Sequence, residues 1–366
     1  MFPYKELKSI HLEISTRCQA SCPMCPRKYH GGIENTNLKM VDWTIDEFKQ
    51  IFTSELLNQL DMIYFCGNFG DPIMNDDLIL MCQHIKDVNP RLITRIHTNG
   101  GARSVKWWTR LYHSLTENHL VCWGIDGLED TNHIYRIGVN FDILIRNAMA
   151  FNSLGGNSEW VFIKFKHNEH QAELVEQRSK ELGFKSFSMK NTTRFVGENR
   201  YSVLDSEGNI LYYLEPPSDN RVTFITPEQI RKASELVKEV TINCYVQSTR
   251  EIYIDANKDV FPCCFLSSSP YTYQPERPEQ GSIKEYVYNF HNKSREQYSE
   301  LVSKLGGLEQ LSALTYSVKE ILERESWQTV WDHYWNTEKL YTCARVCGKT
   351  TNSKPKDQFV KRTNND

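Results

Sequence analysis

The chain has 366 residues, of which 40% are apolar, and this is enough for one large domain and a smaller one. A net charge of -3 excludes a general attraction to nucleic acid or to anionic membranes, and no apolar run approaches a membrane span. The first residues lack the apolar core of a signal peptide, so we expect a cytoplasmic protein. Its 11 cysteines then indicate metal binding more than disulfide bonds.

Strand-like and helix-like segments alternate through the first half of the chain. Short runs that are apolar, or that alternate apolar with polar residues, predict strands at residues 10–15, 62–66, 92–97, 120–125, 160–166 and 187–190. Amphipathic runs between them predict helices at residues 44–57, 76–88, 105–115, 141–154 and 172–182. Six strand–helix units of this kind favour an α/β fold, a partial (β/α)6 TIM-like barrel around a parallel sheet.

The alternation of strands and helices fails after the sixth unit. A Pro-Pro pair at 216–217 and scattered glycines indicate a connection, and a hairpin with a cysteine at each end follows at residues 244–264. The sequence therefore predicts a barrel (1–195), a connecting segment and helix (196–240), a smaller C-terminal cysteine-rich α+β domain (241–348) with a helical insertion (287–326), and a disordered tail (349–366).

Three cysteines directly after the first predicted strand are the strongest functional signal. Cys18, Cys22 and Cys25 fall within eight residues, and Pro23 and Pro26 keep this loop out of a helix. A cubane iron–sulfur cluster normally takes four thiolates, and no nearby fourth cysteine completes the set. One iron would then be open to a group other than protein, which suggests catalysis. The alternative is a zinc knuckle or a disulfide pair.

The next three predicted strands are also followed by unusual loops. These are Gly70-Asp71-Pro72, Asn99-Gly100 and Gly124-Ile125-Asp126. The carboxyl ends of parallel strands in a barrel lie on one rim, so we expect these loops to meet the cysteine loop there. Each is also a common turn sequence when taken alone.

The Cys-x3-Cys-x2-Cys loop resembles that of the radical SAM superfamily. The resemblance implies that Cys18, Cys22 and Cys25 hold a [4Fe–4S] cluster whose open iron is chelated by S-adenosylmethionine. It also implies reduction by an external donor of the flavodoxin or ferredoxin type, and a 5′-deoxyadenosyl radical that abstracts hydrogen from the substrate. The residues implied to contact S-adenosylmethionine are Met24, Gly70, Asp71, Asn99, Gly124, Asp126 and Arg136.

Several of these positions depart from the family pattern. Met24 stands where the family usually has an aromatic residue against the adenine, and Asp71 replaces the glutamate of a Gly-Gly-Glu-Pro motif. Gly124 replaces a frequent serine, so a hydroxyl contact to the cofactor would be absent. Arg136 is a candidate for the methionyl carboxylate, with an ordinary salt bridge as the alternative.

A second cysteine group follows in the C-terminal third. Cys244, Cys263, Cys343 and Cys347 resemble the auxiliary-cluster domain of radical SAM proteins, of the SPASM or twitch type, in its single-cluster form. The resemblance implies a second [4Fe–4S] cluster, and structural zinc bound by four thiolates is the alternative. Cys263 and the adjacent Cys264 are both candidates for this ligand, and placement in the hairpin favours Cys263.

The auxiliary domain is common among family members that modify peptides or protein side chains, so a peptide or protein substrate is the first expectation. The second is oxidation or rearrangement of a small molecule such as a sugar or nucleoside. The third is a non-catalytic zinc-binding or nucleic-acid-binding module. Cys66, Cys82 and Cys122 lie in apolar contexts and are expected to be buried small hydrophobes.

Overall fold

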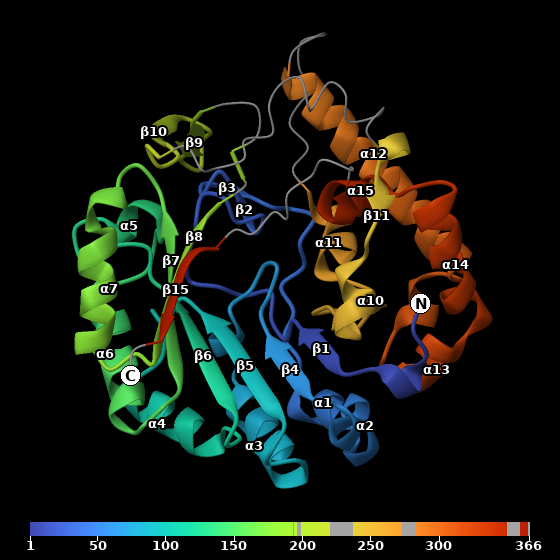
Figure 1. Ribbon diagram of the computed structural model, residues 1–366, viewed down its shortest axis with the longest axis horizontal. Coiled ribbons are helices and arrows are strands. Elements are labelled where there is room, and N and C mark those ends of the chain that lie inside the picture. The colour runs from blue at the N-terminus through green and yellow to red at the C-terminus, as the bar shows by residue number, and fades with distance from the viewer. Residues whose placement is uncertain (193, 196–198, 220–236, 273–282, 350–358, 365–366) are drawn as a thin grey trace.

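The computed structural model describes residues 1–192, 194–195, 199–219, 237–272, 283–349 and 359–364. Within them, a nine-stranded sheet has the order β13-β12-β1-β4-β5-β6-β7-β8-β15 (Figure 1). Its central strands are parallel and follow chain order: β1 (Ser9–Leu12), β4 (Met62–Phe65), β5 (Ile93–Thr98), β6 (His119–Gly124), β7 (Ser158–Lys164) and β8 (Ser186–Asn191). All six predicted strands are thus confirmed.

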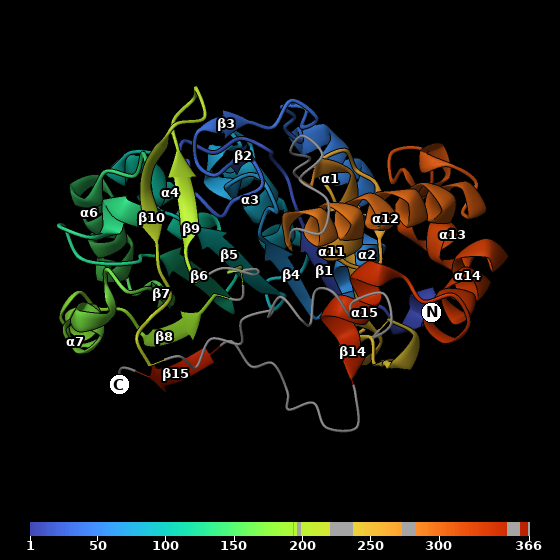
Figure 2. The ribbon, with the colours of Figure 1, turned by 90° about the horizontal axis from the view of Figure 1, so that it is seen from above.

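Helices cover one face of this sheet. Figure 1 shows α3, α4, α6 and α7 around the outside of the strands, and Figure 2 shows the same arrangement from above. The helices that connect the parallel strands are α1 (Ile45–Ile51), α2 (Ser54–Gln59), α3 (Leu78–Val88), α4 (Val105–Ser114), α5 (Asn132–Tyr135), α6 (Phe141–Ser153) and α7 (Ala172–Glu181). The predicted helix at 44–57 is two helices, because the side chain of Thr53 accepts a hydrogen bond from Leu56 N and starts a new one.

Large aromatic side chains fill the layer between the sheet and these helices. The rings of Trp108 on α4 and Trp123 on β6 lie 4.4 Å apart, and Phe151 of α6 packs against both. Trp160 on β7 is also fully buried. Burial of this apolar area is the main force that holds the helices on the sheet.

The C-terminal region lies at the β1 edge of the sheet (Figure 1). Its elements are β11 (Thr241–Ile242), α10 (Tyr245–Thr249), β12 (Glu251–Ile254), β13 (Val260–Phe261), α11 (Cys264–Ser267), α12 (Ile283–Lys304), α13 (Val318–Glu323), α14 (Glu325–Asn336), α15 (Tyr341–Cys347) and β14 (Gly348–Lys349). The expected insertion is helical. The described residues also form short hairpins and 3-10 turns: β2 (Lys28–Tyr29), β3 (Ile33–Glu34), β9 (Tyr201–Leu204), β10 (Ile210–Leu214), and η1 to η5 (Tyr4–Glu6, Pro72–Met74, Glu169–Gln171, Ser269–Tyr271, Leu308–Leu311).

Two parts of the predicted domain plan differ from the structure. The hairpin β12–β13, expected in a separate domain, extends the barrel sheet, because β12 pairs in parallel with β1. The prediction that the tail is disordered is wrong for Phe359–Asn364. These residues form β15, which pairs antiparallel with β8. An unpaired sheet edge offers a row of backbone donors and acceptors, and β15 satisfies those of β8. Most of the helix predicted at the end of the 196–240 segment lies outside the described residues.

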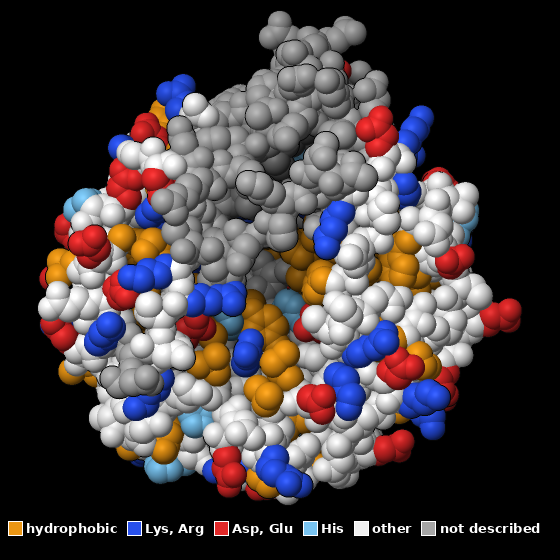
Figure 3. All heavy atoms as spheres, viewed as in Figure 1, with side chains coloured by type: hydrophobic (Ala, Val, Ile, Leu, Met, Phe, Trp, Pro, Cys, Tyr) orange, Lys and Arg blue, Asp and Glu red, His pale blue; other side chains and the backbone are white. Residues whose placement is uncertain are grey.

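The inner face of the sheet, which faces the viewer in Figure 3, carries polar side chains. Apolar, histidine and Lys or Arg side chains gather at the centre of this view. His11, Tyr64 and Arg95 are neighbours across β1, β4 and β5, while His97 and Glu159 each lie beside β6. The sheet therefore separates an apolar helical layer from a polar interior.

The described part of the chain contains no helix with both the length and the apolar character needed to cross a membrane.

His11 provides a test of this polar interior. Its Nε2 lies 2.6 Å from Cys66 O, and burial lowers the pKa of its imidazole to about 4. An unfolded chain would bind a proton at about pH 6.5, so the folded state loses stability as the pH falls from there to about 4, by roughly 3 kcal/mol in total.

We expect His11→Gln, which keeps a donor for Cys66 O, to remove this part of the pH dependence. Urea unfolding of both proteins at about pH 5 and about pH 7.5 measures the difference. The same change in unfolding free energy with pH in both proteins would contradict burial of a neutral imidazole.

Candidate functional site

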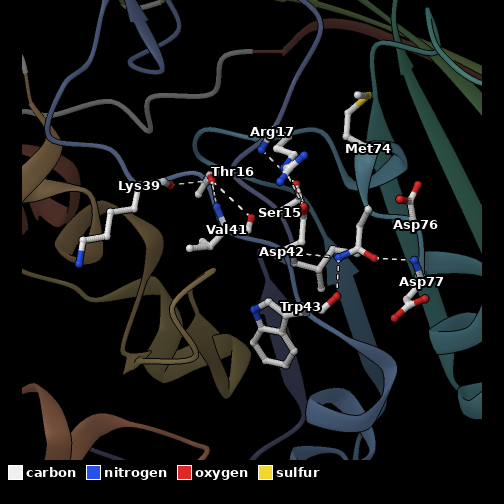
Figure 4. A network of polar contacts seen from close by, with 12 residues as sticks. Ser15, Thr16, Arg17, Lys39, Val41, Asp42, Trp43, Met74, Asp76 and Asp77 are labelled. Carbon is white, nitrogen blue, oxygen red and sulfur yellow. Dashed lines mark hydrogen bonds and ion pairs between the residues drawn. The ribbon is translucent and has the colours of Figure 1, made fainter.

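The cysteine loop begins where strand β1 leaves the sheet, and a neighbouring segment fixes that point (Figure 4). Thr16 N donates to Val41 O at 3.0 Å, and Thr16 Oγ1 donates to Lys39 O at 2.8 Å. Arg17 pairs with Asp42 at 2.7 Å. These contacts hold the backbone immediately before Cys18, so the direction of the loop is set before its first thiol.

The three thiols follow the carboxyl end of β1, and two of them receive side-chain hydrogen bonds. Asn99 Nδ2 lies 3.5 Å from Cys18 Sγ, and Arg136 Nη1 lies 3.8 Å from Cys22 Sγ. Cys25 N donates to Cys22 O at 2.9 Å, which closes the loop into a tight turn. Burial raises the pKa of the Cys18 and Cys22 thiols, and bound iron would favour the thiolate instead.

Asp71 ties the second loop to the third. It is 5% exposed, and its Oδ2 accepts hydrogen bonds from Asn99 N and Asn99 Nδ2, both at 2.7 Å. Thr98 Oγ1 adds a third hydrogen bond at 3.1 Å. At Gly70, an added Cβ would lie 1.8 Å from Ser15 O, so the loop backbone packs directly against the end of β1.

Asp126 and Arg136 form a buried ion pair at the end of β6. Arg136 Nε donates to Asp126 Oδ2 at 2.6 Å, and Ile163 N donates to Asp126 Oδ1 at 2.6 Å. Asp126 is fully buried. A Cβ at Gly124 would lie 2.4 Å from Arg136 Nη2, so the glycine leaves the space that the guanidinium occupies. Gly124, which was predicted only to lack a hydroxyl contact to the cofactor, therefore makes room for Arg136 beside Asp126.

Glu13 also belongs to this rim, although it was not among the site residues predicted from the sequence. Its Oε1 accepts hydrogen bonds from Phe69 N at 2.8 Å and Gly70 N at 3.1 Å, and Tyr253 Oη donates to its Oε2. Burial raises the pKa of this carboxyl to about 7. The available signal was the alternation of this strand, which places Glu13 on the same face as His11 and Ser15.

Other predicted and unpredicted residues lie close by. Met24 is buried, and Arg194 Nη1 donates to its carbonyl at 2.7 Å. Gln19 Nε2 donates to Asn99 Oδ1 at 2.6 Å. Burial also lowers the pKa of Lys190 on β8, whose electrostatic neighbours include Asp126 and Arg136. All the predicted site residues of the barrel thus lie on one rim, and Gln19 and Lys190 join them.

The second cysteine group is assembled by main-chain pairing. Strands β11 and β14 place Ile242 opposite Gly348, and this brings Cys244 beside Cys347. A hydrogen bond from the Cys244 thiol lowers the pKa of Cys347 to about 7. Cys343 and Cys347 are one turn apart on α15, and both interact electrostatically with Cys263.

The other cysteines of the chain have different neighbours from those of this group. Cys264 has Cys66 and Glu13 of the barrel among its electrostatic neighbours, whereas Cys263 has Cys347. This arrangement favours Cys263 as the ligand of the second group. Cys82 and Cys122 are buried as expected, but Cys66 is only partly buried.

The donor sets fit the implied clusters. Three thiols with N–H donors beside them suit a [4Fe–4S] cluster with one open iron, and four thiols suit a fully ligated one. This fit is one of the number and kind of donors: as the side chains lie in the described residues, no group of three or more Cys, His, Asp or Glu is close enough together to hold a single metal ion.

Comparison with solved structures gives matches at 12–16% identity with TM-scores below 0.5. SuiB of Streptococcus suis, solved with its precursor peptide SuiA, has 14% identity and a TM-score of 0.47 over 78% of this chain and 64% of SuiB. The anSMEcpe structure with bound AdoMet has 16% identity and a TM-score of 0.49 over 88% of this chain and 79% of that one. Escherichia coli coproporphyrinogen III oxidase HemN, named a radical SAM enzyme, has 12% identity and a TM-score of 0.37 over 51% and 45%.

The chain therefore spans just under two thirds of the length of SuiB. No protein-family model and no curated protein sequence matches it.

Proposed function

We propose that this chain is a radical SAM enzyme that acts on a peptide or protein substrate. One observation carries the proposal: Cys18, Cys22 and Cys25 leave β1 at the rim where the loops with Asp71, Asn99 and Asp126 also end. Three thiolates and no fourth leave one iron open. A zinc knuckle would not need the surrounding buried carboxylates and their donors.

The cluster would supply the electron that cleaves S-adenosylmethionine and so gives the 5′-deoxyadenosyl radical. The chain's own residues hold and orient the reactants. The rim loops would fix the three thiolates, and Met24, Gly70 and Asp71 would contact S-adenosylmethionine. The inner face of the barrel would then hold the substrate hydrogen near the rim.

The inner face supports a substrate with polar groups. Cys122 Sγ donates to Glu159 Oε2 at 3.3 Å, and Ser188 Oγ donates to Glu159 Oε1, so this carboxylate is held toward the interior. A peptide side chain suits such a site, and a sugar or nucleoside is the alternative. Deuterium carried into 5′-deoxyadenosine from a labelled peptide, or instead from a labelled small molecule, separates the two.

The second cysteine group would hold an auxiliary cluster through Cys244, Cys263, Cys343 and Cys347. Four thiolates saturate it, so its role would be to accept an electron from a substrate radical or to hold the region together. Reduction of the first cluster is proposed to come from an external flavodoxin or ferredoxin, in the cytoplasm.

The catalytic assignment predicts release of 5′-deoxyadenosine. Anaerobically reconstituted protein with S-adenosylmethionine and dithionite should form it, and the variant Cys18→Ala/Cys22→Ala/Cys25→Ala should form none, because the cluster loses all its protein ligands. Cys82→Ala, a buried cysteine away from the rim, is the matched control and should retain release. Release by the triple variant would remove the assignment.

The auxiliary assignment predicts that Cys343→Ala/Cys347→Ala spares this cleavage. Iron analysis should find about four fewer irons per chain in the variant, since one cluster is lost and one retained. Product formation should fall if the second cluster relays an electron. An unchanged iron content, with zinc lost in its place, would identify a structural zinc site.

A further inference from the structure

We propose that Asn99 and Arg136, each held by a buried carboxylate, set the reduction potential of the cluster by donating hydrogen bonds to two of its three thiolates. This inference rests on the proposed function. It gives both residues a task that does not require S-adenosylmethionine, in addition to the cofactor contacts that the resemblance implies.

The two donors are built in the same way. Asp71 Oδ2 holds Asn99 through its backbone N and its Nδ2, both at 2.7 Å, and Asn99 Nδ2 also reaches Cys18 Sγ at 3.5 Å. Asp126 Oδ2 holds Arg136 Nε at 2.6 Å, and Arg136 Nη1 reaches Cys22 Sγ at 3.8 Å. In each case the order is carboxylate, donor, thiol.

Both donors are fixed rather than able to swing away. Gln19 Nε2 holds the side-chain oxygen of Asn99 at 2.6 Å, so its amide orientation is set from both ends. On the other side, the absence of a side chain at Gly124 leaves room for the guanidinium, since a Cβ would lie 2.4 Å from Arg136 Nη2. Neither arrangement is needed merely to fill the core.

The electrostatic consequence has a definite sign. A reduced cluster carries one more negative charge than an oxidised one, so a nearby N–H donor or cation stabilises the reduced state more. Arg136 contacts both the Asp126 carboxylate and the Cys22 thiol, so it separates these two negative groups. Removal of either donor should therefore make the reduction potential more negative.

The test is a redox titration of the reconstituted holoenzyme without S-adenosylmethionine, followed by electron paramagnetic resonance. The signal of the rim cluster is first identified as the one that changes when S-adenosylmethionine is added. Arg136→Gln should weaken the electron affinity at least tenfold, which is a shift of about 59 mV for a one-electron couple. Asn99→Leu should shift the potential in the same direction, and Arg136→Lys, which keeps the charge, should shift it less.

Two matched controls remove similar groups elsewhere. Arg103→Gln removes an arginine that binds Ile73 O and the Asp76 carboxylate, and Asn89→Leu removes an amide that binds Leu57 O. Both should leave the potential unchanged. Gly124→Ala offers a second route, because it displaces the guanidinium while Arg136 and Asp126 are both retained, and it should reproduce the direction of Arg136→Gln even if that variant loses its cluster.

The outcomes distinguish this inference from the function on which it rests. Unshifted or less negative potentials in Arg136→Gln, Asn99→Leu and Gly124→Ala, with wild-type iron content, would overturn the inference and leave the proposed function standing. A wild-type protein that forms no four-iron cluster at the rim would overturn both.

Discussion

Buried carboxylates at the ends of the parallel strands determine how the rim is arranged. Glu13, Asp71 and Asp126 are at most 5% exposed, and a buried carboxylate is strongly unfavourable unless hydrogen bonds satisfy it. The donors come from the next loop or strand along the sheet: Phe69 N and Gly70 N for Glu13, Asn99 N for Asp71, and Ile163 N of β7 for Asp126. Each carboxylate therefore links the end of one strand to the backbone of a neighbour.

The same rim connects the two cysteine groups. The strand β12 precedes Cys263 and pairs with β1, which precedes Cys18, so both groups extend from one continuous sheet. Asn68 Nδ2 donates to Cys264 O at 2.9 Å and adds a side-chain link. Main-chain pairing therefore fixes the separation of the two cysteine groups without a flexible linker.

Local patterns predicted the parallel strands and the gathering of the loops, because apolar alternation and strand ends are read from neighbouring residues. Long-range pairing was not readable in this way. The attachment of β12 to β1 and of β15 to β8 depends on which sheet edges are left unpaired. The contact of Arg136 with Cys22 depends on the space above Gly124, which sequence spacing does not reveal. Glu13 was visible only as one polar position of an alternating strand, between His11 and Ser15.

The central claim is that the polypeptide supplies three ligands to a four-iron cluster. Mössbauer spectroscopy of protein reconstituted with isotopically enriched iron, on a variant that lacks Cys343 and Cys347, tests it most directly. The account predicts that added S-adenosylmethionine changes the isomer shift of one iron and leaves the other three unchanged. Four equivalent irons that do not respond, or no iron bound at the rim, would contradict it.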